Sequence, residues 1–275
     1  MLLFTQIASA IQTYAWSILW AGAVLTAAEF LFPQSRCSLV SRLRAIVFWG
    51  VYIAITAAAT TLFVRLWSSL GWRPWLTLPL GAWLHPEQYP VLRAMGWVAA
   101  PILVGIISDF FYYWFHRIQH AIPLLWRFHS VHHSLREMSA FNSNHHFTEE
   151  IFRIPVVVIP LSLIVVPDAG YVPIIVATVL GMQGLYEHSA TKLHLGPLRY
   201  VIADNRFHRI HHSLEPQHWH KNFGSFSTVW DVIFRTARMP RRNEWPQVGL
   251  ADTPEPSSLS DFLWRPFRRQ SRPLQ

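Results

Sequence analysis

Long apolar runs place the strongest limit on the fold of this 275-residue chain, because each can cross a bilayer. Three of them cover about residues 10–32, 45–64 and 97–115. A helix of about 20 apolar residues spans roughly 30 Å of hydrocarbon. Hydrophobic residues make up 52% of the chain and charged residues only 14%, against roughly 25% charged residues in a typical soluble domain. The sequence therefore predicts an all-α integral membrane protein.

A fourth apolar stretch, residues 154–186, is interrupted by a Pro-Asp-Ala-Gly turn. We interpret it as a hairpin that enters the membrane and returns, which gives a bundle of about four transmembrane helices. The basic loop at residues 36–44 should face the cytoplasm by the positive-inside rule. Residues 116–153 and 187–237 would then meet on that face as a helical, histidine-rich cap.

The last segment, residues 238–275, is polar and rich in Pro and Arg, and it lacks an apolar period. Such a composition buries too little apolar surface to fix one conformation. We therefore expect a loosely ordered cytoplasmic tail. Residues 1–237 are then a single membrane domain.

Composition also limits the chemistry and the partners. The single cysteine, Cys37, excludes an internal disulfide and a cysteine-ligated zinc or iron–sulfur site. The net charge is +8, and basic residues beside membrane spans mark the cytoplasmic side more often than a nucleic-acid site, so we expect no nucleic-acid partner. Arginine outnumbers lysine 21 to 2, a bias that favours a GC-rich bacterium and hence a bacterial inner membrane. The oligomeric state stays open.

Histidines gather in one part of the chain, with 14 of the 15 between His116 and His220. Eight of them form a pair and two H-x-x-H-H triples, namely His116 and His120; His129, His132 and His133; and His208, His211 and His212. Residues three or four apart share a helix face, whereas adjacent residues diverge by about 100°. Each triple can therefore serve two neighbouring ions, and the blocks predict a two-metal site.

Three kinds of function fit such histidines. Imidazole suits zinc, copper, iron and nickel, and two irons with four or five nitrogens each would keep open positions for O₂. A bis-histidine haem electron carrier needs histidines near mid-span, but these blocks lie at span ends. A metal transporter needs ionisable residues along its spans, and Asp109 is the one clear case. We therefore favour a di-iron oxygenase over a metal-binding or transport protein and over a haem carrier.

The sequence around these blocks resembles the fatty acid hydroxylase/sterol desaturase superfamily of membrane di-iron enzymes. The resemblance runs from Asp109 to Thr236 and rests on D-F-F-Y-Y-W-F-H-R-I-Q-H, W-R-F-H-S-V-H-H-S, Glu187-His188, F-H-R-I-H-H-S, K-N-F-G and W-D-V-I-F-R-T. It implies a membrane stem with a cytosolic cap that holds two iron ions. It also implies O₂ as co-substrate and a lipid-like substrate such as a sterol, fatty acyl or ether lipid.

The resemblance also implies a set of metal ligands. Carried over by position, they are His116, His120, His129, His132, His133, His146, His188, His208, His211 and His212. His146 begins a His-Phe-Thr-Glu segment where many relatives have H-P-x-E. Some relatives have a further histidine where this chain has Lys192, with His194 two residues on. His145, His194, His218 and His220 are left without an assigned role, and His85 is expected to lie on the opposite face.

Four polar residues are expected to support the ligands without binding metal themselves. Asp109 lies two helical turns before His116, about 10 Å along the axis, and a carboxylate inside a span is costly enough to imply a function. Glu149 ends the segment that His146 begins. Asn222 and Asp231 match family positions and are expected to brace the cap.

The expected reaction needs electrons from outside the chain. The sequence contains no G-x-G-x-x-G dinucleotide-binding fingerprint and no fused haem-binding domain. We therefore expect a separate redox partner, which could be a reductase, a ferredoxin, a cytochrome or a soluble reduced cofactor. Hydroxylation is favoured over desaturation, and the identity of the lipid stays open.

Overall fold

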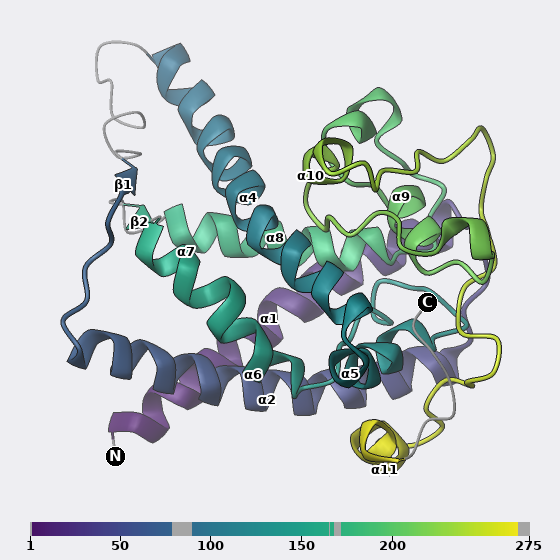
Figure 1. Cartoon of the computed structure of the whole chain (residues 1–275), viewed down its shortest axis with the longest axis horizontal. Coiled ribbons are helices and arrows are strands. Elements are labelled where there is room, and N and C mark those ends of the chain that lie inside the picture. The colour runs from purple at the N-terminus through teal and green to yellow at the C-terminus, as the bar shows by residue number, and fades with distance from the viewer. Residues whose placement is uncertain (1, 79–89, 165, 168–171, 269–275) are drawn as a thin grey trace.

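The computed structural model describes residues 2–78, 90–164, 166–167 and 172–268, and this part of the chain is almost entirely helical (Figure 1). The exception is one parallel pair of two-residue strands, β1 (Thr77–Leu78) and β2 (Val166–Pro167). The all-α prediction is confirmed at this level. His85 and the turn at residues 168–170 lie outside the described residues.

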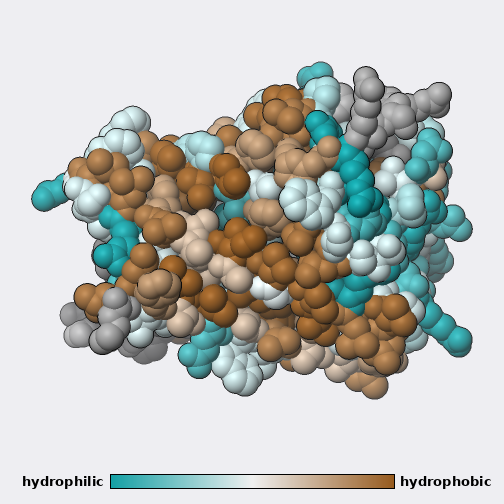
Figure 2. Space-filling model, turned by 90° about the horizontal axis from the view of Figure 1, so that it is seen from below, coloured by the Kyte–Doolittle hydropathy of each residue, from teal (hydrophilic) through white to brown (hydrophobic). Residues whose placement is uncertain are grey.

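Two long helices, α1 (Leu2–Leu31) and α2 (Leu39–Ser69), pack side by side. Both are long and apolar enough to cross a membrane, as predicted for residues 10–32 and 45–64. Ser38 caps α2 by accepting a hydrogen bond from the Ser41 amide. When the molecule is seen from below the view of Figure 1, apolar side chains cover its middle and polar ones gather towards one end (Figure 2). This surface suits a membrane environment.

The predicted third span is longer than expected at both ends. Helix α4 (Pro90–Ala121) continues six residues past residue 115 and carries His116 and His120 in its last turns. Helix α5 (Pro123–His133) begins after Ile122 with Pro123 in its first turn, where a missing amide donor costs nothing. Because the two helices follow each other so closely, the first histidine pair and the first triple lie together.

The expected hairpin is built from short helical segments. Helix α6 (Glu149–Arg153), the π-helical segment η1 (Ile154–Val158) and α7 (Ile159–Ile164) form the first arm. Pro155 and Pro160 each remove a backbone donor, and this coincides with the widened π turn. Helix α8 (Val172–Glu187) forms the second arm and packs on α1 and α4.

Short helices close the end of the molecule where α8 finishes (Figure 1). They are η2 (Gly196–Tyr200), α9 (Asn205–His211), η3 (Pro216–His218) and α10 (Val229–Ile233). Asp204 caps α9 by accepting hydrogen bonds from the amides of Arg206 and Phe207. The cap fixes where α9 begins and so which way the second histidine triple points.

The expectation of a loosely ordered tail is wrong for residues 238–268. This segment carries α11 (Leu259–Trp264) and η4 (Arg265–Phe267) and packs back on α2 and α5. Phe262 is only 1% exposed, and its ring stacks on Phe48 with centroids 4.2 Å apart. The apolar surface that orders the segment lies on the rest of the chain, so its own composition gives no sign of it.

Candidate metal centre

Two groups of histidines meet where α4, α5, α8 and α9 end. One group has five members, His116, His120, His129, His133 and His211. The other has four members, His132, His188, His208 and His212. In each group the nitrogens that could bind a metal lie within 4.8 Å of one another. Nine of the ten ligands expected from the sequence are therefore brought together.

The adjacent histidines of each triple separate as the helical angle predicts. His133 joins the group of five while His132 joins the group of four, and His211 and His212 divide in the same way. The two triples meet directly, because Nε2 of His133 lies 3.1 Å from Nε2 of His211. Residues about eighty positions apart thus form one double site, which is the arrangement that a two-metal centre requires.

Hydrogen bonds to backbone carbonyls fix the proton on several rings. Nδ1 of His188 donates to the Gly184 carbonyl at 2.8 Å, and Nδ1 of His132 donates to the Asn144 carbonyl at 3.3 Å. A carbonyl can only accept, so these rings carry their proton on Nδ1. Their bare Nε2 atoms nevertheless face each other at 3.1 Å. Two lone pairs at that distance repel unless a cation lies between them, so the geometry fits a metal.

The nitrogens of the group of four are spaced closely enough that they could share one metal ion. In the group of four, the Nε2 atoms of His208 and His188 are 3.0 Å apart, and so are those of His212 and His208. With metal–imidazole bonds of about 2.1 Å, neighbouring ligands lie about 3.0 Å apart at 90° and about 3.4 Å apart at a tetrahedral angle. The observed distances are close to the first of these values, so these nitrogens could bind one ion together.

Burial keeps these imidazoles neutral. His129, His132, His133, His208 and His212 are all at most 2% exposed. Burial, followed for most of them by repulsion from neighbouring rings, lowers the pKa of each below its usual value. A histidine must be unprotonated at one nitrogen to bind a metal. The rings are therefore ready to bind without first losing a proton.

A buried carboxylate stands behind each group. Glu149 accepts hydrogen bonds from Gln119 Nε2 at 2.6 Å and from Nδ1 of His129 at 3.2 Å. Burial opposes its charge, but contact with His145 and His129 holds the pKa of Glu149 well below the usual range. On the other side, Glu187 Oε2 lies 3.6 Å from Nδ1 of His208, which is near it but beyond hydrogen-bond distance. A carboxylate on the outer nitrogen orients a ligating imidazole and raises its basicity.

Glu187 was not among the supporting residues expected from the sequence. Its Oε1 accepts a hydrogen bond from the Ser225 hydroxyl at 2.8 Å, and the side chain is buried. The sequence feature that could have identified Glu187 is its position beside His188, at the end of the apolar stretch 154–186. Such a charge is costly at a membrane helix end and so implies a role.

One loop, residues 221–227, orients ligands through its backbone, and we call it the orienting loop. The Phe223 carbonyl accepts from Nδ1 of His116 at 2.7 Å, and the Lys221 carbonyl accepts from Nδ1 of His211 at 2.8 Å. Gly224 has no side chain, and a Cβ there would clash with the Ser227 carbonyl. The loop therefore sets the tautomer of two members of the group of five.

Three of the expected supporting residues hold this loop. Asp109 accepts from the amides of residues 225, 226 and 227, each at 2.9 Å, and so touches the loop but not His116. Asp231 accepts from the amides of residues 223 and 224 at 2.9 and 2.7 Å. Asn222 has a left-handed φ of 61° and donates to the Phe207 carbonyl at 2.8 Å. They act on the ligands through the backbone.

His146, the tenth expected ligand, joins neither group in the described part of the chain. Its Nδ1 pairs with the Thr148 hydroxyl at 2.7 Å, its Nε2 donates to the Leu263 carbonyl at 3.3 Å, and its ring packs on Phe262. His145 takes the inner position instead, since its ring stacks on His132 at 3.9 Å. The turn before α6 decides which of the two neighbours points inward.

The remaining histidines lie away from the two groups. His218 is buried but pairs with the Ser213 hydroxyl at 2.9 Å. His194 is exposed, and its Nδ1 accepts from the Gly196 amide at 3.1 Å. His220 has a φ of 57° in the loop that follows η3. These positions give no reason to add any of them to the ligand set.

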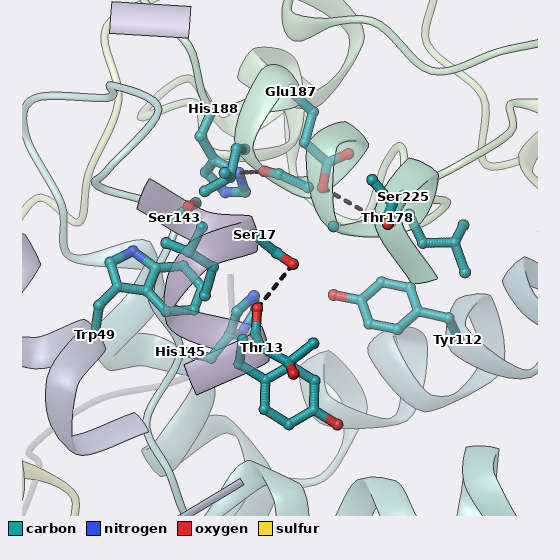
Figure 3. A pocket seen from close by; sticks show the side chains of 16 residues that line it. Thr13, Ser17, Trp49, Tyr112, Ser143, His145, Thr178, Glu187, His188 and Ser225 are labelled. Atoms are coloured by element: carbon teal, nitrogen blue, oxygen red, sulfur yellow. Dashed lines mark hydrogen bonds between the residues drawn. The ribbon is translucent and has the colours of Figure 1, made fainter. Parts of the chain in front are cut away.

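A cavity of about 520 Å³ adjoins the group of four. Residues from α1, α2, α4 and α8 line it, and His145 and His188 lie at its inner end. Trp49 and Tyr112 face it from opposite sides, and Glu187 and Ser225 form a hydrogen-bonded pair on its wall (Figure 3). Its lining is mostly apolar, so it suits a hydrocarbon chain beside the metal centre.

Comparison with known proteins agrees with this geometry. Residues 101–236 match the family model described as fatty acid hydroxylase. The chain is 29% identical over 80% of its length to an ornithine lipid hydroxylase of Rhizobium tropici, 28% identical over 68% to an alkylglycerol monooxygenase of Danio rerio, and 29% identical over 66% to that of Homo sapiens.

The matched regions cover 63%, 42% and 40% of those three relatives, respectively, so the chain spans only part of their length. No solved structure matches the chain. The match of the family model includes all nine histidines of the two groups and the orienting loop. On this evidence residues 101–236 form a fatty acid hydroxylase domain.

Proposed function

We propose that this protein is a membrane-embedded di-iron oxygenase that uses O₂ and an external reductant to hydroxylate a lipid. The observation that carries the proposal is the pair of buried, neutral histidine groups whose bare nitrogens face one another. Imidazole suits iron, and five and four ligands would leave coordination positions open. A four-coordinate, tetrahedral zinc site would need fewer ligands, placed wider apart.

Iron is the metal that this chemistry requires. When bound, two iron ions would supply the activation of O₂ and the oxidation of an otherwise unreactive C–H bond. The chain's own residues do the rest. The histidines would hold the ions, Glu149 would orient His129 through its hydrogen bond, and the orienting loop would fix His116 and His211, while Glu187 lies close to His208. The apolar cavity positions the substrate chain beside the group of four and excludes bulk water.

The proposed substrate is a lipid with an alkyl or acyl chain. Two relatives are named for such lipids, one for an ornithine lipid and the other for an alkylglycerol. The mostly apolar wall of the cavity supports the same class. Both names describe addition of oxygen, which supports hydroxylation over desaturation. Electrons would come from a separate redox partner.

We also propose that four membrane spans carry the site on the cytoplasmic face, in a bacterial inner membrane. The basic loop between α1 and α2 contacts the histidine cap, because Ser38 donates to Glu137 at 2.7 Å and Gln34 donates to the Ala190 carbonyl at 2.8 Å. Glu29, at the same end of α1, accepts from the Ala140 and Ala190 amides at 2.8 Å. If the basic loop is inside, the cap is inside as well.

Metal analysis of purified protein, combined with lipid profiling of cells with and without it, tests this proposal. We expect two irons per chain, one for each histidine group, and a lipid that gains oxygen. His132→Ala should remove metal and activity, whereas the matched control His194→Ala should change neither. A haem spectrum would support an electron carrier instead. Zinc or copper with no change in lipids would support transport or storage.

A further inference from the structure

A groove between α1 and α8 extends from the cavity to the outer surface. A second cavity of about 260 Å³ shares Ser17, Ile18, Thr178, Gly181 and Leu185 with the first. Because the two spaces have these wall residues in common, they adjoin along the contact between α1 and α8. We call them together the α1–α8 groove.

The two ends of the groove lie in different surroundings. At the outer end, Trp16 and Trp20 of α1 are 66% and 56% exposed. At the inner end, His188 belongs to the histidine group of four, and His145 stacks on His132 of that group. If α1 crosses the membrane, for which it is long and apolar enough, the outer end faces hydrocarbon. The groove therefore joins the bilayer to the metal centre sideways.

The lining shows what kind of group can pass. None of the residues described along either cavity is Lys, Arg or Asp, and the single carboxylate, Glu187, is already bonded to Ser225. A phosphate or carboxylate headgroup would lose its hydration without gaining a cation. Hydroxyls of Thr13, Ser17 and Tyr112 can bind an uncharged oxygen. The lining therefore favours an alkyl chain, with at most a neutral polar group, over a charged headgroup.

Glycines keep the α8 side of the groove open. Gly181 and Gly184 line it, and a Cβ added at either would meet nothing within 4 Å. Gly181, Leu185 and His188 are spaced four and three residues apart, so they lie on one face of the helix, which leads to the metal ligand. Because a Cβ added at Gly181 meets no neighbour, a larger side chain there can extend into the groove.

We infer that a membrane lipid enters the site by inserting its uncharged hydrocarbon chain from the bilayer through the α1–α8 groove, with the headgroup left outside. This inference rests on the proposed function. It adds the route and the part of the substrate that reaches the metal centre. It also assigns Gly181 as a residue that determines which chains can enter.

Photolabelling tests the route separately from catalysis. The wild-type protein, in phosphatidylcholine vesicles that contain a long-chain alkyl diazirine, should be labelled at the inner residues Trp49 and Tyr112. Gly181→Leu should lose this inner labelling. The matched control is Gly50→Leu in α2. An added Cβ at Gly50 also meets nothing within 4 Å, but Gly50 lines neither of the two cavities. That control should be labelled like the wild type.

Activity and iron content distinguish a failure of the inferred entry route from a failure of the proposed function. Gly181→Leu should keep its metal and lose oxygenation of the lipid by roughly tenfold or more, because a chain displaced by about 1 Å can already cost that much. Wild-type inner labelling that survives Gly181→Leu, or labelling only of α1 residues at the surface, would overturn the groove. A wild-type protein that binds iron, labels as expected and oxidises no lipid would overturn the proposed function instead.

Discussion

Replacing Asp109 by alanine should weaken both the fold and the metal centre. Asp109 is 2% exposed, and its carboxylate accepts four hydrogen bonds at 2.9 Å, from three successive amides of residues 225–227 and from the Ser227 hydroxyl. It ties α4 to the orienting loop. Asp109→Ala would leave those three amides buried without an acceptor.

The size of the effect follows from that count of amides. A buried donor left unsatisfied costs about 1–3 kcal/mol. The loop can relax in part, so we take the lower limit, which gives about 3 kcal/mol for three amides. Domains of similar size lose roughly 2–4 °C of melting temperature per kcal/mol, so the apparent Tm should fall by about 6–12 °C. Asp109→Asn keeps one acceptor oxygen and should lose less.

The assay is thermal unfolding of the detergent-solubilised protein together with metal analysis. Iron content should fall along with the Tm, because the Phe223 carbonyl that holds Nδ1 of His116 belongs to the same loop. Asp252→Ala changes an exposed aspartate and should leave both quantities unchanged. An Asp109→Ala protein that unfolds like the wild type and carries full metal would refute the role assigned to this carboxylate.

Three further predictions follow from other contacts. Glu29→Ala should lower the free energy of unfolding by about 3–5 kcal/mol, because it removes the carboxylate that pairs with the buried guanidinium of Arg42. Nη1 of Arg42 lies 2.5 Å from Glu29. An unchanged Tm in thermal unfolding would contradict this. Phe262→Ala should expose residues 238–268 to limited proteolysis, whereas Trp264→Ala, which changes a side chain that is 59% exposed, should not. His146→Ala should keep full iron content, and loss of iron would return His146 to the ligand set.

The division of each histidine triple between the two groups could be predicted because it depends on local rules. Helical geometry alone separates His132 from His133 and His211 from His212, and the structure divides them in that way. The long helices follow from apolar runs whose length matches a bilayer. These features need no knowledge of which distant segments touch.

Features that depend on one turn or one distant contact could not be predicted. His145 and His146 differ only in where the turn before α6 points them, and neighbouring positions in a sequence do not record that direction. The order of residues 238–268 depends on Phe262 meeting Phe48, more than two hundred residues away. Glu187 matters through its distance from His208, which only the folded chain sets.

The placement of three of the nine grouped histidines at α9 has a consequence for how the protein is made. His211 completes the group of five, and His208 and His212 supply half of the group of four. A nascent chain that has left the ribosome only as far as α8 therefore has neither complete group, although its membrane helices can already insert. Both histidine groups are complete only after α9 emerges, so interrupted synthesis releases no fragment able to hold a complete two-group metal site.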